Sequence, residues 1–171
     1  MLPKEVVLNE KIKKNNICNN ISFYKFRTIS NRRWIAIQEV PLSSKVETIR
    51  KKENYAKIEE IPQMYKDAVI SVEDHRFYKH RGIDIIAIGR ATYNDIRTWS
   101  FVEGGSTITQ QLSKNIYFTQ KKEITRKIAE VFMSFEIEKN YTKDEILELY
   151  LNTSYFGDGY YTVKEACKRI F

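Results

Sequence analysis

Glu73 opens the stretch of this chain in which residue types suited to chemistry are most concentrated. Asp74, His75 and Arg76 follow it directly, and His80, the second of the chain's two histidines, comes soon after. A carboxylate at the end of an apolar helix and beside cations can serve as a general base near neutral pH, because burial and positive charge act on it in opposite directions. The alternative is a surface glutamate in a charged loop. His75 and His80 are not spaced as a helical metal pair, and we expect ordinary hydrogen bonding from them.

A glycine pair further along the chain precedes a predicted helix start. Gly104 and Gly105 lead into Ser106 and Thr107, and Thr107 has the spacing of a capping box with Gln110. Backbone N–H groups at a helix N-terminus point outward and attract anions. The segment therefore predicts a cradle for an anionic group, with a plain loop-to-helix junction as the alternative. A general base followed by such a cradle favours group transfer on a phosphorylated substrate.

A third candidate element lies on one predicted helical face. Lys122, Arg126 and Glu130 are spaced i, i+4 and i+8, and Lys127 lies beside them. Such a face can present cations and a carboxylate to a pyrophosphate or its metal ion, or it can hold only an exposed ion pair. Spacing alone does not choose between the two. Glu148 lies in a segment whose apolar residues favour a packing helix, and a functional role for Glu148 is the alternative.

The composition is that of a globular chain with an excess of positive charge. The 171 residues are 42% apolar with few glycines and prolines, so one mainly helical domain with a real core is expected. The net charge of +7 favours anionic partners such as phosphate groups, anionic lipid or nucleic acid, or else a solvated lysine-rich surface. Cys18 and Cys167 show no metal or disulfide spacing. No apolar run is long enough to span a membrane or has the form of a signal peptide.

Helical periodicity dominates from Pro62 onward, so the predicted fold class is mainly α. Residues 1–30 have no clean period and are expected to be poorly ordered, whereas 34–40 is expected to be a short strand or an extended segment. The apolar stripe of the first helix is expected at Met64, Tyr65, Ala68, Val69 and Val72. Asp84 is expected to cap a second helix, whose apolar positions are Ile85, Ile86, Ile88, Tyr93 and Ile96. Further helices are predicted after Thr107, over 124–139, and after Thr142 and Thr162, with a turn at 156–159.

Taken together, these segments resemble the motifs of the peptidoglycan glycosyltransferase family, the lysozyme-like domain of class A penicillin-binding proteins and monofunctional transglycosylases. Residues 73–77 with His80 and 82–84 look like the first family motif, and 104–111 with 114–115 look like the second. Residues 126–130, 146–152 and 155–166 look like the third, fourth and fifth. Because five motifs follow one another in family order, the resemblance predicts a lysozyme-like glycosyltransferase domain over 31–171.

The resemblance implies an enzyme that joins lipid II units into β-1,4-linked glycan, with inversion and with release of undecaprenyl pyrophosphate. Glu73 is implied to be the base that deprotonates the acceptor hydroxyl. Glu130 is implied to be the second essential carboxylate, which positions the pyrophosphate or a divalent cation, Mg²⁺ or Mn²⁺. The implied pyrophosphate-binding residues are Ser106, Thr107, Gln110, Lys114, Lys122, Arg126 and Lys127. The other motif residues are Asp74, His75, Phe77, His80, Gly104, Gly105, Glu148 and Asn152.

The resemblance also implies partners and a cellular location. The partners are lipid II, the growing undecaprenyl-pyrophosphate-linked glycan chain, the membrane surface and other cell-wall synthesis proteins, but no nucleic acid. No organic cofactor is implied. The implied location is the outer face of the bacterial cytoplasmic membrane.

The chain departs from the family pattern at several points. Lys122 stands where many members carry arginine, and Thr162 where many carry glycine. The hydrophobic N-terminal anchor and the helices after the fifth motif are not recognised, so we expect a domain that is incomplete at its C-terminal end. Such a domain is expected to be marginally stable, because apolar faces of 124–139 and 145–151 would lose their cover. One rival function is a lysozyme-type hydrolase, against which the phosphate-binding elements count. A second is a non-catalytic domain that only binds lipid-linked precursor or a cell-wall partner. A third, a basic nucleic-acid-binding protein, is disfavoured because no binding motif is recognised.

Overall fold

The structure, a computed structural model, describes residues 40–99, 104–118 and 124–170. The chain divides into two units, Met1–Pro41 and Leu42–Phe171, and the described helices all lie in the second unit. The predicted disorder of 1–30, the predicted strand at 34–40 except for its last residue, and Lys122 therefore lie outside the described residues.

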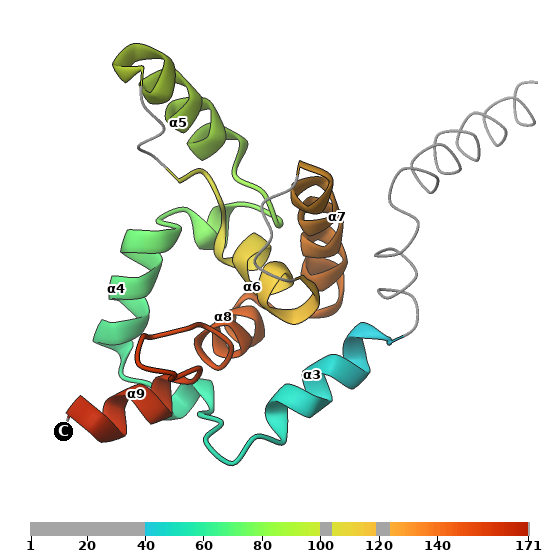
Figure 1. The fold of residues 1–171 in the computed structure, drawn as a ribbon, viewed down its shortest axis with the longest axis vertical. Helices are drawn as coiled ribbons and strands as arrows, with labels where there is room; N and C mark the ends of the chain where they lie inside the picture. Colours follow the sequence, from blue (N-terminus) through green and yellow to red (C-terminus); the bar gives the residue numbers. More distant parts are fainter. Residues whose placement is uncertain (1–39, 100–103, 119–123, 171) are drawn as a thin grey trace, which may run out of the picture. The chain divides into compact units, whose positions relative to one another are not determined.

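The described residues form helices and no strand, which confirms the mainly α class. An isolated bridge joins Arg81 to Ile83. In chain order (Figure 1), the elements are α3 (Leu42–Arg50), the 3₁₀ turn η1 (Ile58–Glu60), α4 (Gln63–Glu73), the 3₁₀ turn η2 (Phe77–Lys79), α5 (Ile85–Thr98), α6 (Ile108–Tyr117), α7 (Ile124–Asn140), α8 (Lys143–Leu151) and α9 (Val163–Ile170).

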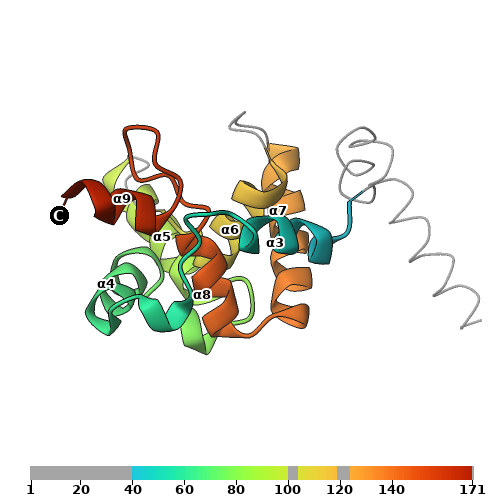
Figure 2. The same ribbon diagram turned by 90° about the horizontal axis from the view of Figure 1, so that it is seen from below.

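The core of the second unit is built around α6 and α8. Helix α6 packs against both α7 and α8, and the two views of the ribbon show these three helices together (Figures 1 and 2). Helix α8 is buried on several sides, as a helix in the middle of a core must be. Its buried residues are Ile146, Leu147, Leu149, Tyr150 and Leu151.

Apolar cover differs between α7 and α8. The expectation that the face of 145–151 would lack cover is wrong, because Ile146, Leu147 and Tyr150 are buried against the other helices. On α7 the expectation is met in part, since Phe132 and Phe135 are 50% and 43% exposed. The difference arises because α8 lies inside the helical assembly, whereas α7 covers it from one side.

Polar side chains define the starts of three helices as predicted. Asp84 caps α5 by accepting backbone N–H groups of its first turn. Thr107 with Gln110, and Thr142 with Glu145, form the capping boxes of α6 and α8. Each cap satisfies N–H groups that the helix itself leaves unpaired. The helix starts near the predicted site are therefore encoded locally.

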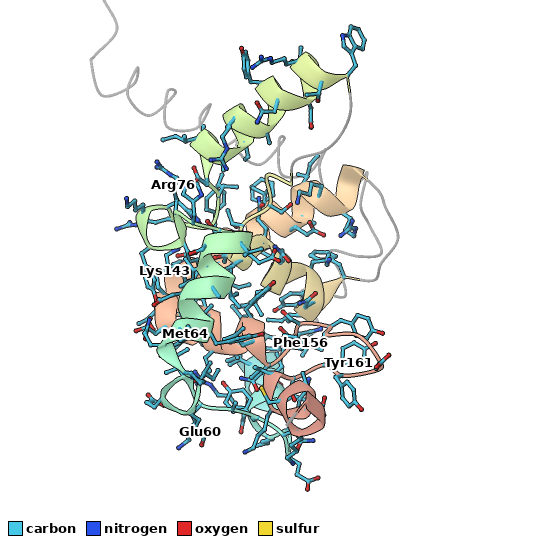
Figure 3. All side chains as sticks on the ribbon, turned by 90° about the vertical axis from the view of Figure 1, so that its left-hand side faces the viewer. Glu60, Met64, Arg76, Lys143, Phe156 and Tyr161 are labelled. Carbon is cyan, nitrogen blue, oxygen red and sulfur yellow. The ribbon has the colours of Figure 1, made fainter. Side chains whose placement is uncertain are left out.

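The face that α4 turns to the core differs from the predicted stripe. Met64 (Figure 3) and Val72 are 83% and 81% exposed, and Ala68 is exposed as well. The side chains of α4 that pack against the core are Tyr65, Val69 and Ile70. The helix is thus rotated by about one residue, roughly 100°, from the predicted orientation. Glu73 lies four residues after Val69 and so on the same side of the helix, but at the exposed end of that row.

Helix α5 forms where it was predicted, but its apolar residues do not make a core face. Figure 1 shows α5 extending away from α4 and α6. Ala91 is its buried residue, and it lies close to Gly105 of the segment before α6. A Cβ placed on Gly105 would lie only 3.4 Å from the Cα of Ile88. The predicted apolar positions are instead between 40% and 75% exposed: Ile85, Ile86, Ile88, Tyr93 and Ile96.

None of the helices in the described ranges combines the length and the hydrophobicity that crossing a bilayer requires.

Glycines occupy positions of positive φ in the loop before α5 and in the turn at 156–159. Gly82 has a φ of +86°, and a Cβ there would lie 3.1 Å from Ser134 Oγ. Its carbonyl accepts a hydrogen bond from Thr107 Oγ1 at 2.6 Å, so this loop is locked to both α6 and α7. The predicted turn at 156–159 is present, with Gly157 and Gly159 at positive φ, a region that other residues seldom adopt.

Candidate active site

A cleft of about 590 Å³ opens between the end of α4, the start of α5 and the segment that precedes α6. Glu73 and Asp74 line it from the end of α4, Arg90 from α5, and residues 104–107 from the loop before α6. The first two predicted elements, which are separate in the sequence, therefore meet at one place. The cleft is large enough for a substrate group of considerable size.

Glu73, the predicted base, is held by Gln111 of α6. Gln111 Nε2 donates to Glu73 Oε2 at 2.8 Å, and the Tyr150 hydroxyl donates to Gln111 Oε1 at 3.3 Å. Burial and, to a smaller extent, the nearby Glu73 carboxylate raise the pKa of Tyr150, so its hydroxyl keeps the proton that it donates. The hydrogen bond from Gln111 fixes the orientation of the Glu73 carboxylate in the cleft wall, and a general base must be positioned within hydrogen-bond reach of the proton that it takes.

The surroundings of Glu73 differ from the prediction in two respects. Glu73 is exposed, and Arg76 pairs with Asp84 at 2.9 Å instead of approaching Glu73. His75 lines the cleft and is exposed. The prediction that Glu73 is buried with Arg76 beside it was therefore wrong, because the glutamate is exposed and the arginine pairs with another carboxylate.

Three members of the first motif have structural roles. Asp74 is buried, and its carboxylate lies 2.9 Å from His80 Nε2 and accepts the N–H of Ile108 at 3.1 Å. The hydrogen-bonding role predicted for His80 is thus confirmed. Phe77 is fully buried, and the Lys143 ammonium lies 4.4 Å from the centroid of its ring. These contacts fix the loop that follows Glu73 onto α6 and α8.

The anion cradle predicted at the start of α6 is filled by groups of the protein itself. Asp74 accepts the Ile108 N–H, and Thr107 Oγ1 accepts the Gln110 N–H at 3.2 Å. The Gln110 side chain accepts the Thr107 N–H and is 2% exposed. The prediction of free donors was therefore wrong at these three N–H groups, and the buried Asp74 carboxylate is itself the anion at this helix N-terminus. Residues 104–106 remain in the cleft wall.

The third predicted element reaches the cleft through Lys127. Lys127 Nζ donates to Ser106 Oγ at 2.5 Å and lies 3.5 Å from Glu130 Oε2. Glu130 is 2% exposed, and its other carboxylate oxygen bonds the Arg126 guanidinium. A buried carboxylate with a cation on each oxygen holds both cations in fixed positions. The Lys127 side chain, which is 48% exposed, is the member of this group that a substrate in the cleft can reach.

Lys114 lies on the same side of α6 as Gln111, because residues three apart on a helix are neighbours on its surface. It is half-buried. The contact with phosphate predicted for Lys114 and for Lys122 stays a prediction.

Glu148 and Asn152 of the fourth motif fasten the segment before η1 to the end of α8. Glu148 Oε2 accepts the N–H of Ile58 at 2.7 Å, and its other oxygen accepts the Tyr55 hydroxyl. The Asn152 side chain exchanges two hydrogen bonds of 2.8 Å with the backbone of Ala56. Burial, followed by the hydrogen bond to Glu148, raises the pKa of Tyr55. The packing role of this segment is thereby confirmed, and both side chains are committed to it.

Glu130, the candidate metal ligand, has cations on both of its carboxylate oxygens. In the part of the chain that the structure describes, no group of three or more His, Cys, Asp or Glu residues is placed to hold a metal ion. A hard divalent cation takes several oxygen ligands. The described residues therefore do not fit a divalent cation held by protein ligands alone, and no chemical step is assigned to one.

A mainly α domain that places a carboxylate and a lysine at one cleft is the arrangement expected of a transglycosylase. The chain matches the family model described as Transglycosylase over residues 26–171, and it belongs to that family. It is 51% identical over 114 residues to penicillin-binding protein 1F of Bacillus subtilis strain 168, which covers 67% of this chain and 16% of that protein. It is 44% identical over 126 residues to the monofunctional glycosyltransferase of Staphylococcus epidermidis strain RP62A, which covers 74% of this chain and 46% of that protein. The chain thus spans less than half the length of these curated relatives.

Gln111 is the site residue that the sequence prediction missed. Gln110 was named as a substrate-binding residue, but the capping box holds it in the interior. The sequence contained a usable signal, because a capping box with Thr107 commits Gln110 to the helix start. The neighbouring Gln111 is then turned by roughly 100° around the helix axis, away from the cap and towards Glu73.

Proposed function

We propose that this chain is a peptidoglycan glycosyltransferase that joins lipid II units into β-1,4-linked glycan strands. Glu73 takes the proton from the 4-hydroxyl of the acceptor sugar, and the resulting oxygen attacks the anomeric carbon of the donor. The bond from that carbon to the pyrophosphate breaks, so undecaprenyl pyrophosphate leaves with the bonding electron pair. Attack opposite the leaving group converts the α-linked donor into a β-linkage.

The observation that carries this proposal is the placement of Glu73 and Ser106 in the wall of one cleft, with Gln111 on the carboxylate and Lys127 on the hydroxyl. The carboxylate is placed to accept a proton. The Lys127 ammonium is placed to stabilise negative charge on a departing pyrophosphate, and fixed charges of this kind act most strongly where charge develops in the transition state.

The buried Glu130 supports the proposed pyrophosphate role of its neighbours. Because Glu130 fixes both Arg126 and Lys127, the cations need little reorganisation when substrate binds. We assign Lys114 and Lys122 to the same leaving group by resemblance to the family. Mg²⁺ or Mn²⁺ would enter as a companion of the pyrophosphate and not as a resident metal of the protein.

The proposed substrates and setting follow from the same function. The donor and the growing chain are lipid-linked, so the enzyme works at a membrane surface, on the outer face of the cytoplasmic membrane. Two relatives are named as penicillin-binding proteins and others as monofunctional glycosyltransferases. Other proteins of cell-wall synthesis are its expected partners.

The test is incubation of the purified chain with lipid II, followed by separation of glycan polymer, undecaprenyl pyrophosphate and free sugar. Polymer formed together with undecaprenyl pyrophosphate is the expected result. Cleavage of preformed glycan without polymer would instead identify a hydrolase. Binding of lipid II without any turnover would identify a non-catalytic precursor-binding domain.

A further inference from the structure

A second large pocket lies outside the catalytic cleft. It has a volume of about 720 Å³ and is bounded by residues 78–81, around η2, and by the end of α7 and the start of α8. The residues that line it share no member with the lining of the cleft. We call it the basic pocket, and its charged lining residues besides His80 are Lys79, Arg81, Glu138, Lys139 and Lys143.

The charges of the basic pocket are not balanced within it. Glu138, its carboxylate, already accepts Lys143 Nζ at 2.7 Å and Thr109 Oγ1 at 2.6 Å, and its side chain is 7% exposed. Lys79, Arg81 and Lys139 are exposed, and no ion pair is found for them among the described residues. Three uncompensated cations around one hollow create a positive potential that concentrates anions.

His80 adds a buried polar atom to the wall of the basic pocket. Its Nε2 is engaged by the Asp74 carboxylate at 2.9 Å. The His80 side chain is only 6% exposed. Its Nδ1 is buried and has no hydrogen-bond partner within the described part of the chain. Buried polar atoms are nearly always paired, so the unpaired ring nitrogen is an unusual feature of a residue that lines this pocket.

The remaining wall suits an anion that carries a ring or another flat group. Tyr78, Phe135 and Tyr141 line the pocket beside the cations. Tyr78 donates its hydroxyl to Asp144 at 3.0 Å, which engages that neighbouring carboxylate. Thr142, which also lines the pocket, caps α8 together with Glu145, so the N-terminus of that helix is already occupied by a carboxylate of the protein. Figure 3 shows Lys143 on the side of the molecule that also carries Arg76.

We propose that the basic pocket is an anion site that takes a phosphate-bearing ligand and is separate from the catalytic cleft. The ligand is held by Lys79, Arg81 and Lys139. Its phosphate belongs either to a soluble phosphate ester or to an anionic lipid headgroup. His80, which lines this pocket, also contacts Asp74 in the wall of the cleft.

The test is a two-dimensional amide NMR titration of the chain with inorganic pyrophosphate at constant ionic strength. We expect saturable shifts at residues 78–81 and 139–143, distinct from shifts at 104–107 and 126–130 that report the catalytic cleft. The double substitution Lys79→Gln/Lys139→Gln should weaken the first set roughly tenfold and leave the second set unchanged. Lys57→Gln/Lys164→Gln removes the same charge elsewhere and should change neither set by more than about twofold.

A parallel titration with phosphatidylglycerol vesicles, against phosphatidylcholine vesicles, separates the two phosphate sources. Saturable shifts with pyrophosphate support a soluble ligand, and loss of signal at 78–81 and 139–143 with the anionic vesicles alone supports a lipid headgroup. Shifts spread evenly over the lysines, equal losses in the control variant, or no response to either probe would overturn the proposal. None of these results depends on glycosyl transfer by the chain.

Discussion

Gln111 Nε2 donates to Glu73 Oε2 at 2.8 Å, and this contact joins the last residue of α4 to α6. The Tyr150 hydroxyl supports the amide from the other side. A residue from α8 thus supports a residue from α6, which in turn supports the proposed base on α4. The helical core and the catalytic carboxylate are connected by side-chain hydrogen bonds.

Substitution of the two adjacent glutamines of α6 should affect different properties, the rate of polymerisation for Gln111 and the stability of the fold for Gln110. Gln111→Ala removes the hydrogen bond to Glu73, so we expect polymerisation to fall by at least about tenfold with little change in melting temperature. Gln110→Ala removes half of a buried capping box, so we expect a loss of about 1 kcal/mol in the free energy of unfolding. Thermal melting and initial rates at saturating lipid II measure the two effects. Equal rate losses without any difference in stability would contradict the division of roles.

Lys127 and Glu130 should differ in their effects on stability while both lower turnover. Glu130→Gln leaves the Arg126 guanidinium without its buried carboxylate, so we expect a loss of about 3 kcal/mol or more in the free energy of unfolding. Lys127→Ala removes a half-exposed cation and should cost no more than about 1 kcal/mol. Denaturant unfolding and lipid II polymerisation provide the measurements. If both variants polymerise normally, the cluster is a structural ion pair and has no role at the pyrophosphate.

Asp84 should make the fold sensitive to acid. Burial opposes its ionisation, but hydrogen bonds from the Ala87 and Ile86 N–H groups and the charge of Arg76 prevail, so the pKa of Asp84 is lowered from its ordinary value of 3.8. A carboxyl with a lowered folded-state pKa contributes stability above the unfolded value, and that contribution is lost as pH falls through the folded value.

The measurement for Asp84 is the melting temperature as a function of pH. Between about pH 5 and pH 2, the wild-type chain should lose more stability than Asp84→Asn, which starts lower because it lacks the charge that pairs with Arg76. Parallel curves for the two proteins would show that Asp84 does not contribute to the acid response.

Gly82 and Gly89 should respond oppositely to replacement by alanine. At Gly82 the φ of +86° and the close backbone of Ser134 oppose a Cβ, so we expect Gly82→Ala to destabilise the fold by roughly 1–3 kcal/mol. Gly89 lies inside α5 with no atom within 4 Å of the Cβ position. Gly89→Ala should therefore be neutral or stabilising by about 0.5–1 kcal/mol. Equal destabilisation of both variants in denaturant unfolding would contradict this assignment.

The features that the sequence predicted correctly are those encoded over a few residues. The caps at Asp84, Thr107 and Thr142 depend on a side chain and an N–H group in the same turn, so spacing identifies them. The rotation of α4 was not predicted, because packing against other helices decides which of its apolar residues face inward. The sequence pattern alone does not distinguish the row of Tyr65 from the row of Met64.

The residues of the candidate site were predicted more completely than the contacts between them. Glu73 and Ser106 were named and both line one cleft, and Lys127, also named, donates to Ser106. The contact of Asp74 with the N-terminus of α6 and that of Gln111 with Glu73 join positions far apart in the chain. Such contacts have no local signature, so neither the filled cradle nor the role of Gln111 followed from spacing.

The most direct test of the proposed mechanism is polymerisation of lipid II by Glu73→Gln. The substitution keeps the size of the side chain but removes the group that accepts the proton, so the rate should fall by roughly 10²–10⁴-fold while lipid II binding and the melting temperature are retained. Glu59→Gln, at an exposed position on η1, is the matched control and should keep the wild-type rate. Turnover by Glu73→Gln at close to the wild-type rate would contradict the assignment of Glu73 as the catalytic base.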